Sequence, residues 1–204
     1  MVWRFNNKTE AKKVVFSLTQ SEIQLFFIET TLDSVKILAS DIHSYKNQAE
    51  LSDICNRWVQ QSSSKRQDCY WLLARDLYKT IQVKRPNAPD AEIDAALKWL
   101  VKDQVDLPLD RLLVTHYQPL SQDPSLALEL ATAIIVEKDL IENLIQLTES
   151  LGLKLHSIEI SELTAGYALT EHFEDQSITG LIDEDQQGLV YNFTSVQNWL
   201  LLGI

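Results

Sequence analysis

The stretch of sequence that decides the fold is YWLLARDLYKTIQVKRPNAPDAEIDAALKWLVKDQVDLPLD, residues 70–110. The apolar run CYWLLA (69–74) predicts a buried strand, and the run KTIQVKR (79–85) predicts a second strand. Pro86 and Pro89 interrupt the chain, and Pro89 suits the first turn of a helix, where its missing N–H costs nothing. The stretch therefore predicts two strands followed directly by a helix.

The predicted helix begins with negative charge and carries one apolar stripe. Asp90 and Glu92 fall in its first turn, where carboxylates suit the helix dipole. The helix is expected to run to about Val105, with Asp106 accepting a hydrogen bond at the turn and Pro108 ending the helix. The residues expected to form a buried stripe are Ile93, Leu97, Leu100, Val101 and Val105.

Trp99 and the pair Lys102–Asp103 lie off this stripe, and two interpretations stand side by side. The plainer one is a helix that packs on a small sheet and is followed by a rigid connecting segment. The other is that Trp99, with Lys102, Asp103 and Asp106, faces a partner protein, because tryptophan is over-represented among the residues that anchor interfaces.

The residues before this stretch predict a β-meander and a helix. The runs KKVVFSL (12–18), IQLFFIET (23–30) and SVKILASDI (34–42) read as strands joined by short polar connections. Residues 46–61 carry apolar side chains at helical spacing. Together with 69–74, the first third of the chain predicts the order βββαβ.

The residues after the stretch complete a second unit. Strands are predicted at 111–118 and 127–137, a helix at 138–151 that Gly152 ends, and a strand at 153–160. With the strand and helix of the opening stretch, the order is βαββαβ, the split βαβ arrangement.

The remaining residues predict a return to helix and then a new group of strands. Residues 161–173 read as a helix with Ser161 as its N-cap, and strands follow at 177–184, 188–194 and 196–204. Because the chain stops on an apolar strand, we expect the fold to continue past residue 204, through a second half and a membrane segment that are missing here.

Composition and charge exclude several classes of function. The 204 residues are 45% hydrophobic and 23% charged, which is ordinary for a globular protein. The net charge of −11 argues against binding to nucleic acid or to an anionic membrane surface. No stretch is a signal peptide or is long enough to insert into a membrane, so a cytoplasmic location is expected. Cys55 and Cys69 are expected to be reduced, although the sequence leaves a disulfide between them open.

The chain lacks the sequence signatures of common catalytic and metal sites. It contains no Walker A, GxGxxG or GxSxG motif. His116 and His156 lie on predicted strands of the same unit, which would allow them to approach each other. A histidine pair without a cysteine or carboxylate companion is more often structural than a metal site, so no metal is expected.

The order of elements resembles the first half of an actin-like (ribonuclease-H-like) α/β (α+β) fold with an inserted βαββαβ subdomain, as in the cell-division protein FtsA and the pilus protein PilM. Residues 70–110 are similar to the MSHA pilus biogenesis family MshI, related to PilM and to the cytoplasmic part of GspL, with 98–103 (KWLVKD) and 106–108 (DLP) as the matching motifs. The likeness continues through 147–169 and covers 69–204, whereas the first 68 residues match only in their pattern of elements.

The resemblance implies four segments. Residues 1–76 would form the first part of actin-like subdomain 1A, and residues 77–160 the inserted 1C-type subdomain. Residues 161–176 would return to subdomain 1A as a helix, and residues 177–204 would begin the second lobe, which looks truncated.

In actin-like ATPases the phosphates lie between two β-hairpins, and both hairpins depart from that pattern here. The first, Phe16–Ser21, has neither Gly nor Asp, and Leu18 would occupy a position where close approach needs glycine. In the second, Asp183 is in place, but Glu184 and Asp185 follow where Gly and a hydroxyl residue are expected, so 183–185 is interpreted as a solvated turn. No nucleotide cofactor is therefore expected. If ATP and Mg²⁺ did bind, the contacting residues would be Ser17, Thr19, Asp183 and Gly188.

The resemblance implies a cytoplasmic, non-enzymatic docking component of the inner-membrane platform that assembles an MSHA-type type IV pilus. Its partners would be the pilus assembly motor ATPase and a PilN-like inner-membrane protein, and partners or a missing C-terminal segment would hold it at the membrane. The alternative is a PilM-like ATP-binding protein whose nucleotide state regulates assembly. A third interpretation is a small-ligand-binding module of two α/β lobes. The sequence leaves the oligomeric state open.

Overall fold

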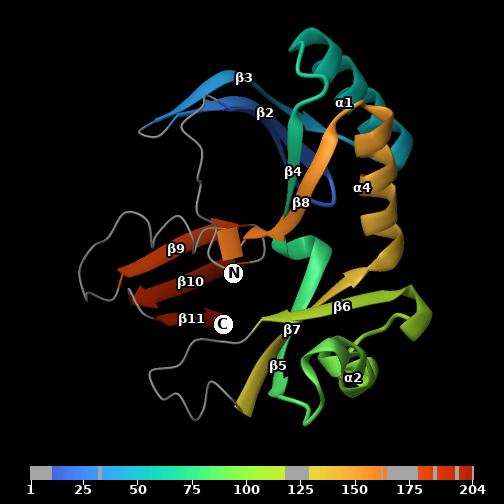
Figure 1. Ribbon diagram of the computed structural model, residues 1–204, viewed down its shortest axis with the longest axis vertical. Helices are drawn as coiled ribbons and strands as arrows, with labels where there is room; N and C mark the ends of the chain where they lie inside the picture. Colours follow the sequence, from blue (N-terminus) through green and yellow to red (C-terminus); the bar gives the residue numbers. More distant parts are fainter. Residues whose placement is uncertain are drawn as a thin grey trace. The chain divides into compact units, whose positions relative to one another are not determined.

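A computed structural model describes residues 11–31, 34–117, 129–161, 163–164, 179–185, 188–195 and 198–203, and for the last three ranges it describes the backbone alone. The chain divides into two compact units (Figure 1). Unit 1 comprises residues up to 74 together with 143–159, and unit 2 comprises 75–142 together with the residues from 160 onward.

Unit 1 is built on a five-stranded sheet with the strand order β3-β2-β1-β4-β8. β1 pairs antiparallel with β2 and parallel with β4, and β2 pairs antiparallel with β3. The predicted meander is thus confirmed. The strands are β1 (Ala11–Leu18), β2 (Glu22–Thr30), β3 (Val35–Ser44), β4 (Asp68–Leu73) and β8 (Lys154–Ile160).

Two helices pack on one face of this sheet, α1 (Gln48–Gln61) and the C-terminal part of α4 (Lys138–Ser150) (Figure 1). Alternate side chains of β1, β2 and β4 are buried beneath them, as expected for strands covered on one face. The Phe16 ring packs on Trp58 of α1 and on Trp71 of β4, with centroids 5.9 Å and 4.7 Å away. At the end of α4, Gly152 has φ +69°, which favours glycine as the helix stop.

Unit 2 contains a three-stranded antiparallel sheet with the order β5-β7-β6. Its strands are β5 (Tyr78–Lys84), β6 (Leu112–Tyr117) and β7 (Leu130–Glu137), and α2 (Ile93–Leu100) covers one face. The central strand β7 is buried from Ala131 to Val136. The core between α2 and the sheet comprises Ile93, Leu97, Val101, Leu112, Val114, Ala131, Ala133 and Ile135.

A further antiparallel sheet is formed by β9 (Thr179–Asp185), β10 (Gly188–Ser195) and β11 (Asn198–Gly203), which confirms the strands predicted there. The predicted helix 161–173 falls outside the described residues except for positions 161, 163 and 164, and the loop 121–125 falls outside them entirely. Within the described ranges, no helix is both long and apolar enough to cross a bilayer.

Two expectations about the second unit are wrong in detail. The predicted helix to Val105 ends at Leu100, and a separate 3₁₀ turn follows at Lys102–Gln104. Strand β8 follows in sequence as expected, but it lies in the five-stranded sheet next to β4, not with the strands of the inserted unit. The division into four segments stays a prediction.

Candidate functional site

Helix α2 has one buried face and one exposed face. Ile93, Leu97 and Val101 are each 0% exposed, which confirms them as a core stripe. At about 100° per residue, Trp99 points roughly 160° away from the mean direction of these three side chains. Its side chain is accordingly exposed, at 65%. The predicted position of Trp99 off the stripe is therefore confirmed.

Leu100 is the exception to the predicted stripe, because it is 52% exposed. It lies about 60° from the mean direction of the buried residues and at the very end of the helix, so the sheet no longer covers it. Val105, also assigned to the stripe, is extended and packs against the core from outside the helix. Pro108 precedes another 3₁₀ turn, in which its carbonyl accepts the N–H of Arg111 at 3.0 Å.

We define the α2 surface as the exposed residues at the end of this helix, Trp99, Leu100, Lys102 and Asp103. The Lys102 Nζ lies 5.8 Å from the centroid of the Trp99 ring, within the range of a cation–π contact. This contact holds a cation over the indole and leaves the exposed Leu100 beside it. The α2 surface thus combines an aromatic group, an aliphatic group and charges of both signs.

Two lysines attach α2 and the segment that follows it to the sheet. Lys79 of β5 donates from Nζ to the carbonyl of Gln104 at 2.7 Å, and Lys98 of α2 donates to the carbonyl of Leu112 at 2.6 Å. The Gln104 carbonyl lies in the 3₁₀ turn after α2, and the Leu112 carbonyl belongs to the first residue of β6. Each ammonium group thus gives a backbone acceptor a side-chain partner. The α2 surface is therefore carried by a firmly attached element.

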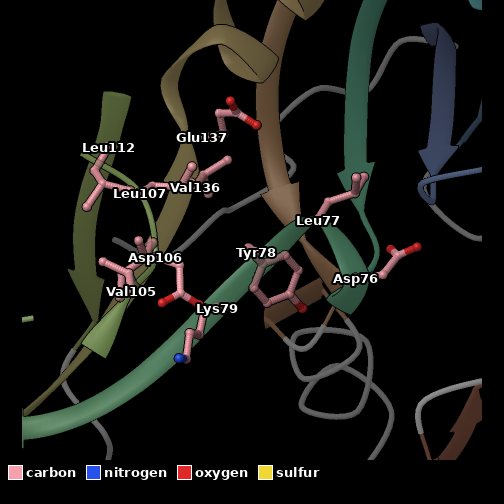
Figure 2. A pocket seen from close by; sticks show the side chains of 11 residues that line it. Asp76, Leu77, Tyr78, Lys79, Val105, Asp106, Leu107, Leu112, Val136 and Glu137 are labelled. Atoms are coloured by element: carbon pink, nitrogen blue, oxygen red, sulfur yellow. The ribbon is translucent and has the colours of Figure 1, made fainter. Parts of the chain in front are cut away.

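Asp106, the fourth predicted partner-binding residue, lines a shallow depression of about 300 Å³ at the base of β5 (Figure 2). Lys79, Tyr78 and Leu107 line the same depression. Its other ionisable lining residues are Asp76 and Glu137, and Glu137 forms an ion pair with Arg111. The charged residues of this depression are three carboxylates and one lysine among mainly apolar neighbours, and Trp99 does not line it.

The first predicted phosphate hairpin, between β1 and β2, has its backbone donors occupied from within. The Thr19 Oγ1 accepts the N–H of Ser21 at 3.2 Å and the N–H of Glu22 at 2.9 Å. The Thr19 N–H in turn donates to the Glu22 carbonyl at 2.9 Å. The Tyr45 hydroxyl donates to the Thr19 carbonyl from the end of β3. The Thr19 hydroxyl thus occupies two backbone N–H groups of the turn.

Leu18, which stands at the position where close approach would need glycine, has a buried side chain. Its side chain is 0% exposed and belongs to the core of unit 1, so it cannot obstruct a ligand on the outside of the hairpin. Ser17 and Thr19, the two weak nucleotide candidates on either side, are half-buried. The residue that occupies the hairpin donors is therefore Thr19.

The second hairpin differs from the expected turn. Strand β9 continues through Asp185, and Asp183 pairs with Val190 while Asp185 pairs with Gly188. Residues 183–185 are therefore strand and not a solvated turn, and the connection, Gln186 and Gln187, lies outside the described residues.

Each histidine predicted to form a pair has a different partner. The His116 Nδ1 lies 2.5 Å from the Asp94 Oδ1 of α2, within unit 2. The His156 ring packs on Tyr70 in unit 1, with centroids 4.6 Å apart, and Lys13 lies 5.5 Å from the same tyrosine ring. The approach of the two histidines stays a prediction. In the part of the chain that the structure describes, no three His, Cys, Asp or Glu residues gather as metal ligands.

Both cysteines are free and buried, Cys55 on α1 and Cys69 on β4. Burial, with the neighbouring Cys69 thiol, raises the pKa of Cys55 to about 12. Burial also raises the pKa of Cys69 to about 12, against the opposing effect of a hydrogen bond with Thr148. Both thiols are therefore protonated at neutral pH and are not nucleophiles.

Sequence reasoning missed Leu100, Lys79 and Tyr45 as parts of these sites. Leu100 falls seven residues, or about two helical turns, after Ile93, so periodicity alone assigns it to the core. Lys79 and Tyr45 act on backbone carbonyls 25 and 26 residues away, and no sequence signal marks such contacts.

No protein-family model and no curated protein sequence matches this chain. Solved structures do match. The PilM–PilN type IV pilus biogenesis complex aligns with a TM-score of 0.70 at 12% identity, over 95% of this chain and 60% of that one. This chain thus spans less than two thirds of the pilus protein's length.

Two further structures align less closely. The cytoplasmic domain of EpsL, an inner-membrane component of the type II secretion system of Vibrio cholerae, has a TM-score of 0.55 at 13% identity, over 95% of this chain and 71% of that one. A Bacteroides thetaiotaomicron protein with an actin-like ATPase fold has a TM-score of 0.51 at 10% identity, over 98% and 71%. The finer likeness to MshI remains a prediction. These similarities, with the α/β sheets described above, show that this chain has the actin-like fold predicted from the order of its elements.

Proposed function

We propose that this chain is a non-catalytic docking component of the inner-membrane platform that assembles a type IV pilus of the MSHA kind. It binds a PilN-type inner-membrane protein and the assembly motor ATPase. The observation that carries the proposal is the similarity of fold to the PilM–PilN complex over 95% of this chain. The fold of EpsL, from another secretion platform, supports the same general role.

The first hairpin supports a role without catalysis. In an actin-like ATPase this hairpin offers backbone N–H groups to phosphate, whereas here the Thr19 hydroxyl accepts two of them. A phosphate would have to displace these bonds, and the neighbouring Glu22 would add negative charge beside it. The protein therefore works by contact, not by hydrolysis.

The α2 surface is the docking face in this proposal. Trp99 is a large side chain that is 65% exposed on a helix whose other face is fully buried. Burial of an indole ring removes a large apolar area from water, and tryptophans of this kind dominate interface energetics. Contact with the PilN-type protein places this chain at the cytoplasmic side of the inner membrane.

The test is binding of residues 1–204 to the purified PilN-type protein and motor ATPase of the same source, measured by titration calorimetry. Trp99→Ala is expected to weaken binding to one of these partners by about tenfold or more, as for an interface anchor. Lys102→Ala is expected to have a smaller effect, because it removes only the charge over the ring.

Leu155→Ala provides a matched control, because it removes an exposed leucine from unit 1. It is expected to leave both affinities unchanged. Binding that Trp99→Ala leaves intact would keep the docking role and reject the α2 surface. Absence of binding to both partners would reject the docking role. Release of phosphate from Mg-ATP by this chain would reject the non-catalytic part.

A further inference from the structure

Strand β3 is an outermost strand of the five-stranded sheet, with no neighbour on its outer side among the described strands (Figure 1). It spans 10 residues, and most of its side chains are exposed. Val35, Ile37 and Ile42 are 67%, 58% and 57% exposed. An edge strand presents unpaired N–H and C=O groups, so a long apolar edge of this kind is a template for another strand.

A bulge sorts the side chains of β3 onto two faces. Ile37 pairs with Ile28 and Ala39 pairs with Phe27, so Leu38 has no opposite residue on β2. Without the bulge, Ile37 and Ile42 would lie on opposite faces, because side chains alternate along a strand.

With the bulge, the partners on β2 show which residues share a face. Val35, Ile37 and Ile42 lie opposite Thr30, Ile28 and Gln24, which share one face of β2. Lys36 and Asp41 lie opposite Glu29 and Leu25, which share the other. The apolar residues thus gather on one face, and the two charges on the other.

We propose that two copies of this chain associate by antiparallel pairing of β3 with β3 of a second copy. The two-fold axis passes through Ala39. The residues of β3 are counted outward from Ala39 by the positions that pair with β2, which leave out Leu38. On one side the order is Ile37, Lys36 and Val35, and on the other it is Ser40, Asp41 and Ile42. Two-fold pairing therefore places Lys36 opposite the partner's Asp41 and Val35 opposite the partner's Ile42.

Charge complementarity identifies the occupant as a second copy. A two-fold contact uses the same residues on both sides, so it is favourable only if the strand complements itself. Lys36 and Asp41 are the two residues of opposite charge on β3, on the same face and at equal paired distance from Ala39. Opposite charges that face each other across an antiparallel pair stabilise it, and so do apolar pairs.

Three features of β3 act against pairing, and each is accommodated. Lysines and bulges are devices that protect sheet edges, but here the bulge creates the match between Lys36 and Asp41. Asp41 already contacts His43 at 2.8 Å through Oδ2 and accepts the Ile42 N–H at 2.9 Å through Oδ1. Each carboxylate oxygen has a second lone pair, which is available to an ammonium group. The net charge of −11 opposes association overall, so the dimer is expected to be strengthened by salt screening of the distant charges.

The test is sedimentation velocity of residues 1–204 from low micromolar to millimolar concentration. The protein is expected to show a reversible monomer–dimer equilibrium. Lys36→Asp and Asp41→Lys each turn two attractive pairs into repulsive ones, so each is expected to weaken the dimer by about tenfold or more. The double variant Lys36→Asp/Asp41→Lys restores both pairs with the charges exchanged, and it is expected to recover the dimer.

The positions are exposed at the edge of the sheet, so the variants are expected to fold, as checked by circular dichroism. A protein that remains monomeric at every concentration overturns the proposal. So does a dimer that the single variants leave unchanged, or one that the double variant fails to recover. These outcomes do not depend on pilus partners, because the measurement uses this chain alone.

Discussion

Trp71 and Thr148 connect a strand and a helix of unit 1 through one buried hydrogen bond. The indole Nε1 of Trp71 donates to the Thr148 Oγ1 at 2.8 Å, and that hydroxyl donates to the Leu144 carbonyl at 2.7 Å. Trp71 and Thr148 are both 0% exposed. Water cannot replace either partner there. The hydrogen bond between the two side chains therefore satisfies polar atoms that would otherwise be buried without a partner.

The exchange Thr148→Val keeps the shape of the side chain and removes the acceptor. The Trp71 N–H is then buried without a partner, so the free energy of unfolding is expected to fall by about 1–3 kcal/mol in urea denaturation. In a Trp71→Phe background the same exchange is expected to cost clearly less, because no indole N–H remains to be satisfied. Equal costs in the two backgrounds would contradict this account.

Sequence periodicity predicts the strands and helices that are covered by other elements on one face only. β1 and β2 alternate between buried and less buried residues, and α1 buries the predicted face with Leu51, Ile54, Cys55, Trp58 and Val59. These patterns follow from local geometry, since a strand repeats every two residues and a helix about every 3.6. The meander, the helices α1 and α4 and the later strands could therefore be predicted from the sequence.

The errors concern positions that local periodicity does not determine. α2 ends at Leu100 because the chain turns there, and whether Leu100 is covered depends on how far the sheet extends beneath it. β8 has a strand pattern in either sheet, and its place beside β4 depends on long-range pairing. For the candidate site, the exposure of Trp99 could be predicted, whereas the anchoring by Lys79 required the structure.

Leu97 and Leu100 of α2 test this distinction within a single element. Leu97 is fully buried and Leu100 is half exposed, although both are leucines in the same helix. Leu97→Ala is expected to lower the free energy of unfolding by about 2–5 kcal/mol through lost burial and a cavity. Leu100→Ala is expected to cost about 0.5 kcal/mol, as for an exposed position. Similar losses for the two variants in urea denaturation would mean that the helix packs differently.

At the scale of the whole molecule, the described side chains form two hydrophobic cores, each made of different residues. The core of unit 1 contains Phe16 and Trp71, and the core of unit 2 contains Ile93 and Leu97. The chain passes from one unit to the other within α4, whose residues up to 142 belong to unit 2 and whose later residues belong to unit 1. Sequence patterns reveal both cores but not this crossing, because the helical repeat is continuous through it.

Separate cores predict separate cooperative units in amide hydrogen exchange. Leu97→Ala is expected to speed exchange in β5, β6 and β7 while β1, β2 and β4 keep their protection, because it damages only the core of unit 2. Thr148→Val is the reciprocal control, and it is expected to speed exchange in β1, β2 and β4 instead. If either variant speeds exchange equally in both sheets, the units unfold together, and the continuous helix α4 then couples them strongly enough to override the separation of their cores.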